Sequence, residues 1–200
     1  SCAHDELMYE DWGCPELWMD WKSEIGYVAF ASDVFTEAEM DQRGHVEVTG
    51  LCGPGVDPHL YQAPRADQKR LNNAGLVLYH GIHLEGKMGD LLARIAEASG
   101  KDRHISAVAE VGDKKELISN ELFGDYPDPH LWFDLQLWKL CSAEIGKALQ
   151  KADPANAASY AAATEAYLAE IEETHQWALA RSKELPPGKR KVVTSHDAYN

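Results

Sequence analysis

The 200-residue sequence lacks any apolar run close to the ~20 residues that a membrane-spanning helix needs. It starts without a methionine or a charged-then-apolar signal pattern, so we expect any export signal to have been removed. Its four cysteines stand at irregular spacings with no Cys-x-x-Cys pair, which argues against a zinc ribbon or a thioredoxin-like site. Two alternatives stay open for Cys2, a disulfide with Cys14 and a lipid-attachment site.

Positive charge is also scarce, with 19 basic against 33 acidic side chains and a formal net charge of −14. Such a chain repels phosphate backbones and anionic lipid headgroups, which argues against a nucleic-acid partner. The acidic balance suits a protein that attracts cations, although solubility alone is the commoner reason for it. A hydrophobic content of 44% is enough for a core, and the length allows one domain plus part of another.

The hydrophobic pattern predicts an α/β fold. Residues 1–24 show no clear period and stay unassigned, whereas residues 25–152 predict a lobe with a parallel sheet and flanking helices. We expect strands at residues 27–30, 45–51, 74–79 and 105–108. We expect helices at residues 32–40, 64–71, 89–98 and 131–149.

A longer helix is predicted over residues 153–185. Asp153 and Pro154 supply an N-cap and a proline at the first helical position, and Pro186 ends the alanine-rich run. About thirty helical residues span on the order of 45 Å, which is longer than one small domain needs. We therefore expect this helix to link two domains, and residues 189–200, with a strand at Lys191–Thr194, to begin a second, truncated α/β lobe.

The tripeptide Asp-Pro-His occurs twice, at residues 57–59 and 128–130. Proline fixes its own φ and favours an extended residue before it, so each histidine is expected at a stiff turn ahead of a helix. Ligand sites of α/β proteins cluster at such turns. Each aspartate is placed to orient its imidazole by accepting a hydrogen bond from the ring nitrogen that does not bind metal. His59 and His130 are therefore candidate metal ligands.

Two further histidines follow predicted strands. His196 stands directly after the strand at 191–194 and is a third candidate ligand, whereas His83 is interpreted as a capping residue outside the metal site. The remaining histidines have no such context and are interpreted as surface residues: His4, His45, His80, His104 and His175.

Four segments resemble the cluster A-I metal-binding solute-binding proteins of ABC importers, the TroA/ZnuA-like family. They are VTGLCGPGVDPHLY, YHGIHLEGKM, DPHLWFD and KVVTSHDAY, and they follow the family's order over about residues 46–200. The resemblance implies an extracytoplasmic, monomeric, two-lobed protein that is joined by one rigid helix. Such a protein binds one Zn²⁺ or Mn²⁺ in its cleft, delivers the ion to an ABC permease and is not an enzyme.

The resemblance assigns His59, His130 and His196 as metal ligands and does not assign His83 as one. A glutamate at the third position is common in manganese-type members, so His196 favours zinc. The histidine-rich acidic loop of many zinc members is absent, which leaves manganese open. The fourth ligand of the family is a carboxylate in the C-terminal lobe, beyond Asn200, and residues 1–24 do not resemble the family's first strand.

Two other functions remain as alternatives. Three histidines and an open position also form a hydrolytic zinc site, but the sequence offers no HExxH or similar spacing to supply a general base. A surface adhesin of the same fold is the other alternative. Membrane contact is expected only through a lipid anchor or through docking to the permease.

Overall fold

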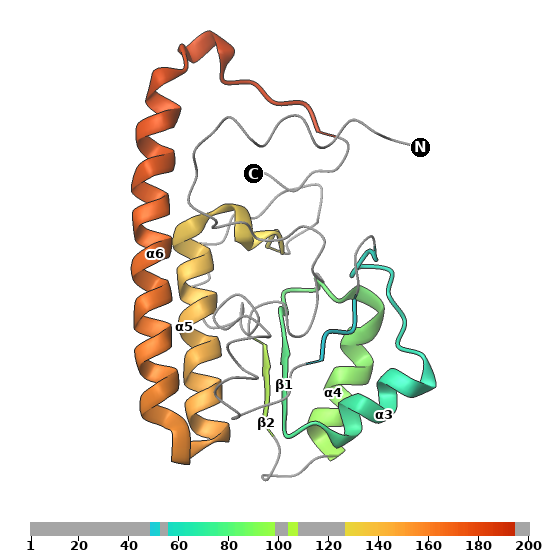
Figure 1. Ribbon diagram of the computed structural model, residues 1–200. Coiled ribbons are helices and arrows are strands. Elements are labelled where there is room, and N and C mark those ends of the chain that lie inside the picture. Colours follow the sequence, from blue (N-terminus) through green and yellow to red (C-terminus); the bar gives the residue numbers. More distant parts are fainter. Residues whose placement is uncertain (1–48, 53–55, 99–103, 108–126, 195–200) are drawn as a thin grey trace, which may run out of the picture.

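The computed structural model describes residues 49–52, 56–98, 104–107 and 127–194 (Figure 1). The predicted elements at 27–30 and 32–40, and most of the one at 45–51, lie outside these residues. The elements are α3 (Arg65–Asn73), β1 (Leu76–Tyr79), η1 (Gly86–Met88), α4 (Gly89–Ala98), β2 (His104–Ala107), η4 (Leu131–Phe133), α5 (Leu135–Ala152), η5 (Pro154–Asn156), α6 (Ala157–Glu184) and η6 (Pro187–Lys189).

The strands β1 and β2 form a parallel pair, with Leu76 opposite His104 and Tyr79 opposite Ala107. Helix α4 lies between them in the sequence, so the described residues contain a β-α-β order, the usual connection of parallel strands. The predicted α/β class is therefore confirmed. The predicted strands at 74–79 and 105–108 correspond to β1 and β2, with shorter bounds.

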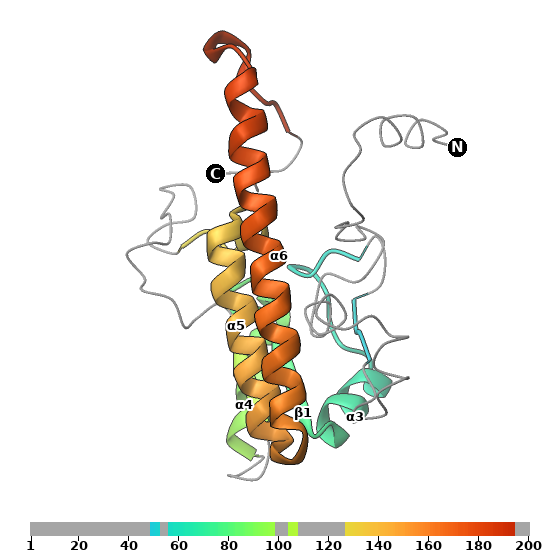
Figure 2. The same ribbon diagram turned by 60° about the vertical axis from the view of Figure 1, so that its left-hand side comes forward.

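Strand β1 is covered on both faces, as its run of apolar residues requires. Leu76 and Leu78 belong to a core shared with α5 and α6, whereas Val77 and Tyr79 belong to a second core with α3 and α4. This division follows from the alternation of side chains along a strand. Figures 1 and 2 show the resulting layers, with the α5–α6 pair on one side of the strands and α3 and α4 on the other.

The helices near the site begin where the local sequence favours it. Helix α4 has the predicted bounds, and α3 begins directly after Pro64. The helix predicted over 131–149 is divided, because the Asp134 carboxylate accepts hydrogen bonds from the backbone N–H of Gln136 (2.8 Å) and of Leu137 (3.3 Å). This N-cap starts α5 at Leu135 and leaves the preceding turn as the 3₁₀ helix η4.

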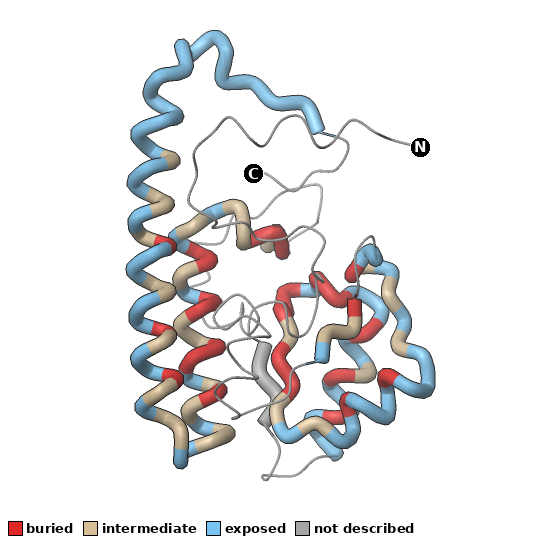
Figure 3. Tube along the Cα trace, in the orientation of Figure 1, coloured by how far each residue is buried: buried red, intermediate tan, exposed pale blue. Residues whose placement is uncertain are grey.

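The helix predicted over 153–185 is present as η5 and the 28-residue α6. It runs back along α5, and a close packing contact between Gly146 and Thr164 joins the two helices. The buried residues of α6 are Tyr160, Thr164 and Ile171, none of them beyond the middle turn of the helix. The second half extends past α5 and is largely exposed (Figure 3).

The strand predicted at Lys191–Thr194 is wrong for the described structure. These residues have no regular secondary structure and are exposed, with Val192 at 82% and Val193 at 98%. A strand needs a hydrogen-bonded neighbour, and β1 and β2 lie near the other end of α6 (Figure 1). Among the described residues, no helix is both long and apolar enough to cross a membrane.

Candidate metal centre

The repeated Asp-Pro-His sequence gives a repeated local structure. In the first copy the backbone N–H of His59 donates to Oδ1 of Asp57 at 2.9 Å, and in the second the N–H of His130 donates to Oδ1 of Asp128 at 2.8 Å. Each aspartate thus forms a turn with the residue two positions on, a bond that its short side chain makes readily. The two histidines are therefore placed by the same device on two segments 71 residues apart.

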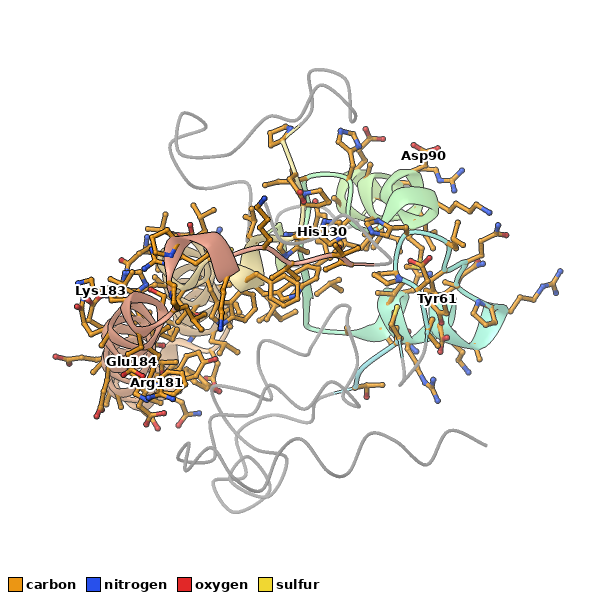
Figure 4. All side chains as sticks on the ribbon, turned by 90° about the horizontal axis from the view of Figure 1, so that it is seen from above. Tyr61, Asp90, His130, Arg181, Lys183 and Glu184 are labelled. Carbon is orange, nitrogen blue, oxygen red and sulfur yellow. The ribbon has the colours of Figure 1, made fainter. Side chains whose placement is uncertain are left out.

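The structure brings these two histidines together. Their Nε2 atoms lie 3.2 Å apart, with the rings nearly perpendicular at an angle of 71°. Two nitrogens bound to one tetrahedral Zn²⁺ at about 2.0–2.1 Å would lie about 3.3–3.4 Å apart. The pair therefore has almost the separation that a shared ion requires. Figure 4 labels His130 between the α5–α6 pair and the α3–α4 side of the molecule.

His130 is held by Asp128 through its ring as well as its backbone. The imidazole Nδ1 lies 2.6 Å from Oδ1 of Asp128, and the two side chains are only 3% and 1% exposed. This carboxylate can only accept, so the ring proton is assigned to Nδ1 and the lone pair to Nε2, which faces His59. The predicted orienting role of the aspartate is thus present at His130.

One residue of the site was missed in the sequence. His80 was interpreted as a surface residue, but it is fully buried at the carboxyl end of β1. Its ring contacts the Trp132 ring edge-on at 5.8 Å, and Trp132 in turn contacts His130 at 5.2 Å. The pKa of His80 is lowered to about 3, mainly by burial and to a lesser extent by the nearby His130 and His59, against an opposing hydrogen bond with the Pro129 backbone. The position directly after a buried strand was the signal that could have found it.

The other predicted residues lie as follows. His83 is exposed, in a turn with a φ of 62°, and its predicted place outside the metal shell stays a prediction. His196 lies outside the described residues, as do His4 and His45. His175 is half-buried on α6. Within the described part of the chain, no group of three or more His, Cys, Asp and Glu side chains is arranged to hold a metal ion, so the site consists there of two candidate ligands.

Comparison with known families gives this pair a context. A family model described as zinc-uptake complex component A, periplasmic (ZnuA) matches residues 35–200. The chain belongs to the ZnuA family. The match includes all three predicted ligands and both Asp-Pro-His segments.

Individual relatives agree with this assignment. The chain is 38% identical over 177 residues to the manganese-binding lipoprotein MntA of Bacillus subtilis, covering 88% of this chain and 56% of the relative. It is 35% identical over 157 residues to the zinc-binding protein TroA of Treponema pallidum, covering 78% and 49%. The solved structure of that periplasmic zinc-binding TroA matches with a TM-score of 0.74 at 34% identity, over 85% of this chain and 58% of TroA. The chain thus spans about half the length of these relatives.

Proposed function

We propose that this ZnuA-family chain captures a divalent metal ion, Zn²⁺ or Mn²⁺, outside the cytoplasm and delivers it to an ABC permease. The observation that carries the proposal is the 3.2 Å approach of the two Nε2 atoms of His59 and His130, with Asp128 fixing the His130 ring. The names of the relatives support it, since MntA is a manganese-binding lipoprotein and TroA a zinc-binding protein. Neither alternative function, hydrolase or adhesin, gains support from them.

The ligand set that we propose is His59, His130 and His196, completed by a carboxylate of a second lobe. Two imidazoles leave a tetrahedral ion two positions short, which is the number that His196 and a carboxylate would fill. Imidazole is a good ligand for zinc and also binds other transition metals, so the described pair does not choose between zinc and manganese. No general base for water activation is assigned, and we propose binding without turnover.

The proposed organisation places residues 25–152 in the N-terminal lobe, 153–185 in the interlobe helix and 189–200 at the start of the C-terminal lobe. Support comes from α6, whose buried residues extend no further along the helix than Ile171, near its midpoint. Its second half and the following segment expose large apolar side chains. These are Trp177, Leu179, Leu185, Val192 and Val193. A second lobe packed there would cover them.

We place the protein in the periplasm or at the extracytoplasmic cell surface, on the ground that its relatives are named as periplasmic proteins or lipoproteins. Attachment through a lipid on Cys2 is one form of this proposal, and Cys2 lies outside the described residues. For delivery of the ion we propose docking to the permease, without any further contact with the membrane. We propose a monomer, because one chain supplies the whole predicted histidine set.

The test is a competition titration with a zinc chelator, repeated with Mn²⁺. We expect His59→Ala and His130→Ala each to weaken binding by at least tenfold, because each removes one of few ligands. His175→Ala is the matched control, since this half-buried histidine lies on α6 away from the turns, and its affinity should equal that of the unmodified protein. Equal affinities for all three variants would refute the proposed site.

A further inference from the structure

The turn that follows β1 has an unusual backbone. Gly81, Ile82 and His83 have successive positive φ values of 87°, 49° and 62°. Glycine adopts this left-handed region freely, but a β-branched residue such as Ile82 is strained there. Strain of this kind, about 1–3 kcal/mol for each such residue, persists only where the surroundings fix it. The turn must therefore be held by specific contacts.

Glu85 provides the main polar contact. Glu85 is 3% exposed, and its carboxylate accepts the backbone N–H of His80 at 2.5 Å on one oxygen and that of Gly81 at 3.0 Å on the other. Both carboxylate oxygens are thus directed back to the end of β1. Ile82 and Leu84 are buried, with exposed fractions of 8% and 1%, and their apolar packing offsets the backbone strain. These polar and apolar contacts together hold the turn in one conformation.

The turn ends at Gly86, which lies directly against the proposed ligand segment. A Cβ added to Gly86 would lie 2.6 Å from the backbone carbonyl oxygen of His59, closer than real Cβ contacts come. The carbonyl is not the end of a flexible side chain, so His59 itself would have to move. Gly89, three residues on, has nothing within 4 Å of an added Cβ.

We propose that Gly86, fixed in place by Glu85, is a positioning residue for His59. This inference rests on the proposed function, since it assigns a role toward the same metal. The missing side chain at Gly86 lets the His59 backbone lie close to the turn, which sets the approach of His59 Nε2 to His130. A metal site tolerates ligand displacements of only about 0.5 Å, so a contact with the backbone of a ligand has a direct effect on affinity.

The main experiment compares Gly86→Ala with Gly89→Ala. We expect Gly86→Ala to weaken Zn²⁺ binding at least tenfold, and Gly89→Ala to change it less than threefold. Affinity is measured by chelator competition at a temperature at which circular dichroism shows every variant fully folded. A purely structural role of Gly86 would lower the melting temperature and leave this affinity unchanged, and that result would overturn the inference.

A double-variant cycle tests whether the effect passes through His59. In a His59→Ala background, Gly86→Ala should cause no further loss, because the residue that it displaces no longer binds. A further tenfold loss there would overturn the inference. If Gly86→Ala does not fold, Glu85→Gln replaces it in the same cycle. An amide supplies one acceptor oxygen instead of two, so we expect at least a threefold loss, again absent in the His59→Ala background.

The two proposals fail in different ways. If His59→Ala and His130→Ala leave zinc affinity unchanged, the proposed function is wrong. If these variants weaken binding but neither Gly86→Ala nor Glu85→Gln does so, the metal site stands and only the positioning role is wrong.

Discussion

The contrast between Asp128 and Asp57 allows a quantitative prediction. Oδ1 of Asp128 accepts both the backbone N–H and the ring Nδ1–H of His130, in surroundings where the aspartate is 1% exposed. Replacing such an orienting carboxylate typically costs a metal site about 10–100-fold in affinity, or about 1.4–2.7 kcal/mol. We expect Asp128→Asn to fall in this range, because the amide keeps the shape but loses the charge that favours the Nδ1–H tautomer.

Asp57→Asn is the matched variant. Asp57 is exposed and accepts the backbone N–H of His59 at 2.9 Å, a turn that asparagine forms equally well. We expect a loss below about threefold. The assay is chelator competition with Zn²⁺ on both variants, with unfolding followed in parallel to show that the folded fraction is unchanged. Equal losses in the two variants would refute the argument that the ring contact of Asp128 sets the difference.

Three further predictions concern pH and packing. Zinc affinity should fall at least tenfold between pH 7.5 and 5.5, because protons compete for the ligand nitrogens; equal calorimetric affinities would exclude histidine ligands. The folded-state pKa of His80, about 3, lies below its unfolded value near 6.5. The contribution of His80 to the free energy of unfolding is therefore present above pH 6.5 and is lost as the pH falls toward 3. His80→Asn should lower the pH slope of the unfolding free energy of the metal-free protein by about one proton in this range. Gly146→Ala should lower the free energy of unfolding in denaturant titrations by about 1–2 kcal/mol, because the added Cβ would lie only 2.9 Å from the Cβ of Thr164 and this clash outweighs the gain in helix propensity. Gly75→Ala is the control and should not destabilise the protein, because an added Cβ there has nothing within 4 Å.

Much of the local structure could be predicted because the sequence carries its own start and stop signals. The helix at 89–98, the strand at 74–79 and the proline-started helix after Asp153 are all present, with small shifts of their bounds. The strand at 191–194 was wrong because alternation of side chains predicts only the capacity to form a strand. Such a segment becomes a strand only when a second strand pairs with it, and none of the described residues does so.

The site could be predicted only in part, for a related reason. The repeated Asp-Pro-His turn predicted that His59 and His130 belong together, and the structure brings the two rings into contact, because the stiffness of the turn is encoded in three adjacent residues. Their role as metal ligands stays a prediction. His80 was missed because its burial depends on Trp132, some fifty residues away. The contact between Gly86 and the His59 carbonyl is likewise a tertiary property, and a glycine in a turn has several more common explanations.

In the proposed metal site the two histidines differ in how readily they can bind an ion. His130 is 5% exposed with its proton on Nδ1, so its Nε2 lone pair is ready before any metal arrives. His59 is half-buried, and its Nε2 takes part in the 3.2 Å contact that an ion would replace. In the proposed site an ion would replace the contact between the two Nε2 atoms, while the contact with Asp128 keeps the His130 ring in place. His59 is the more exposed of the two residues, so we expect the proposed capture to begin at His59 and to need no opening of the buried core around His130.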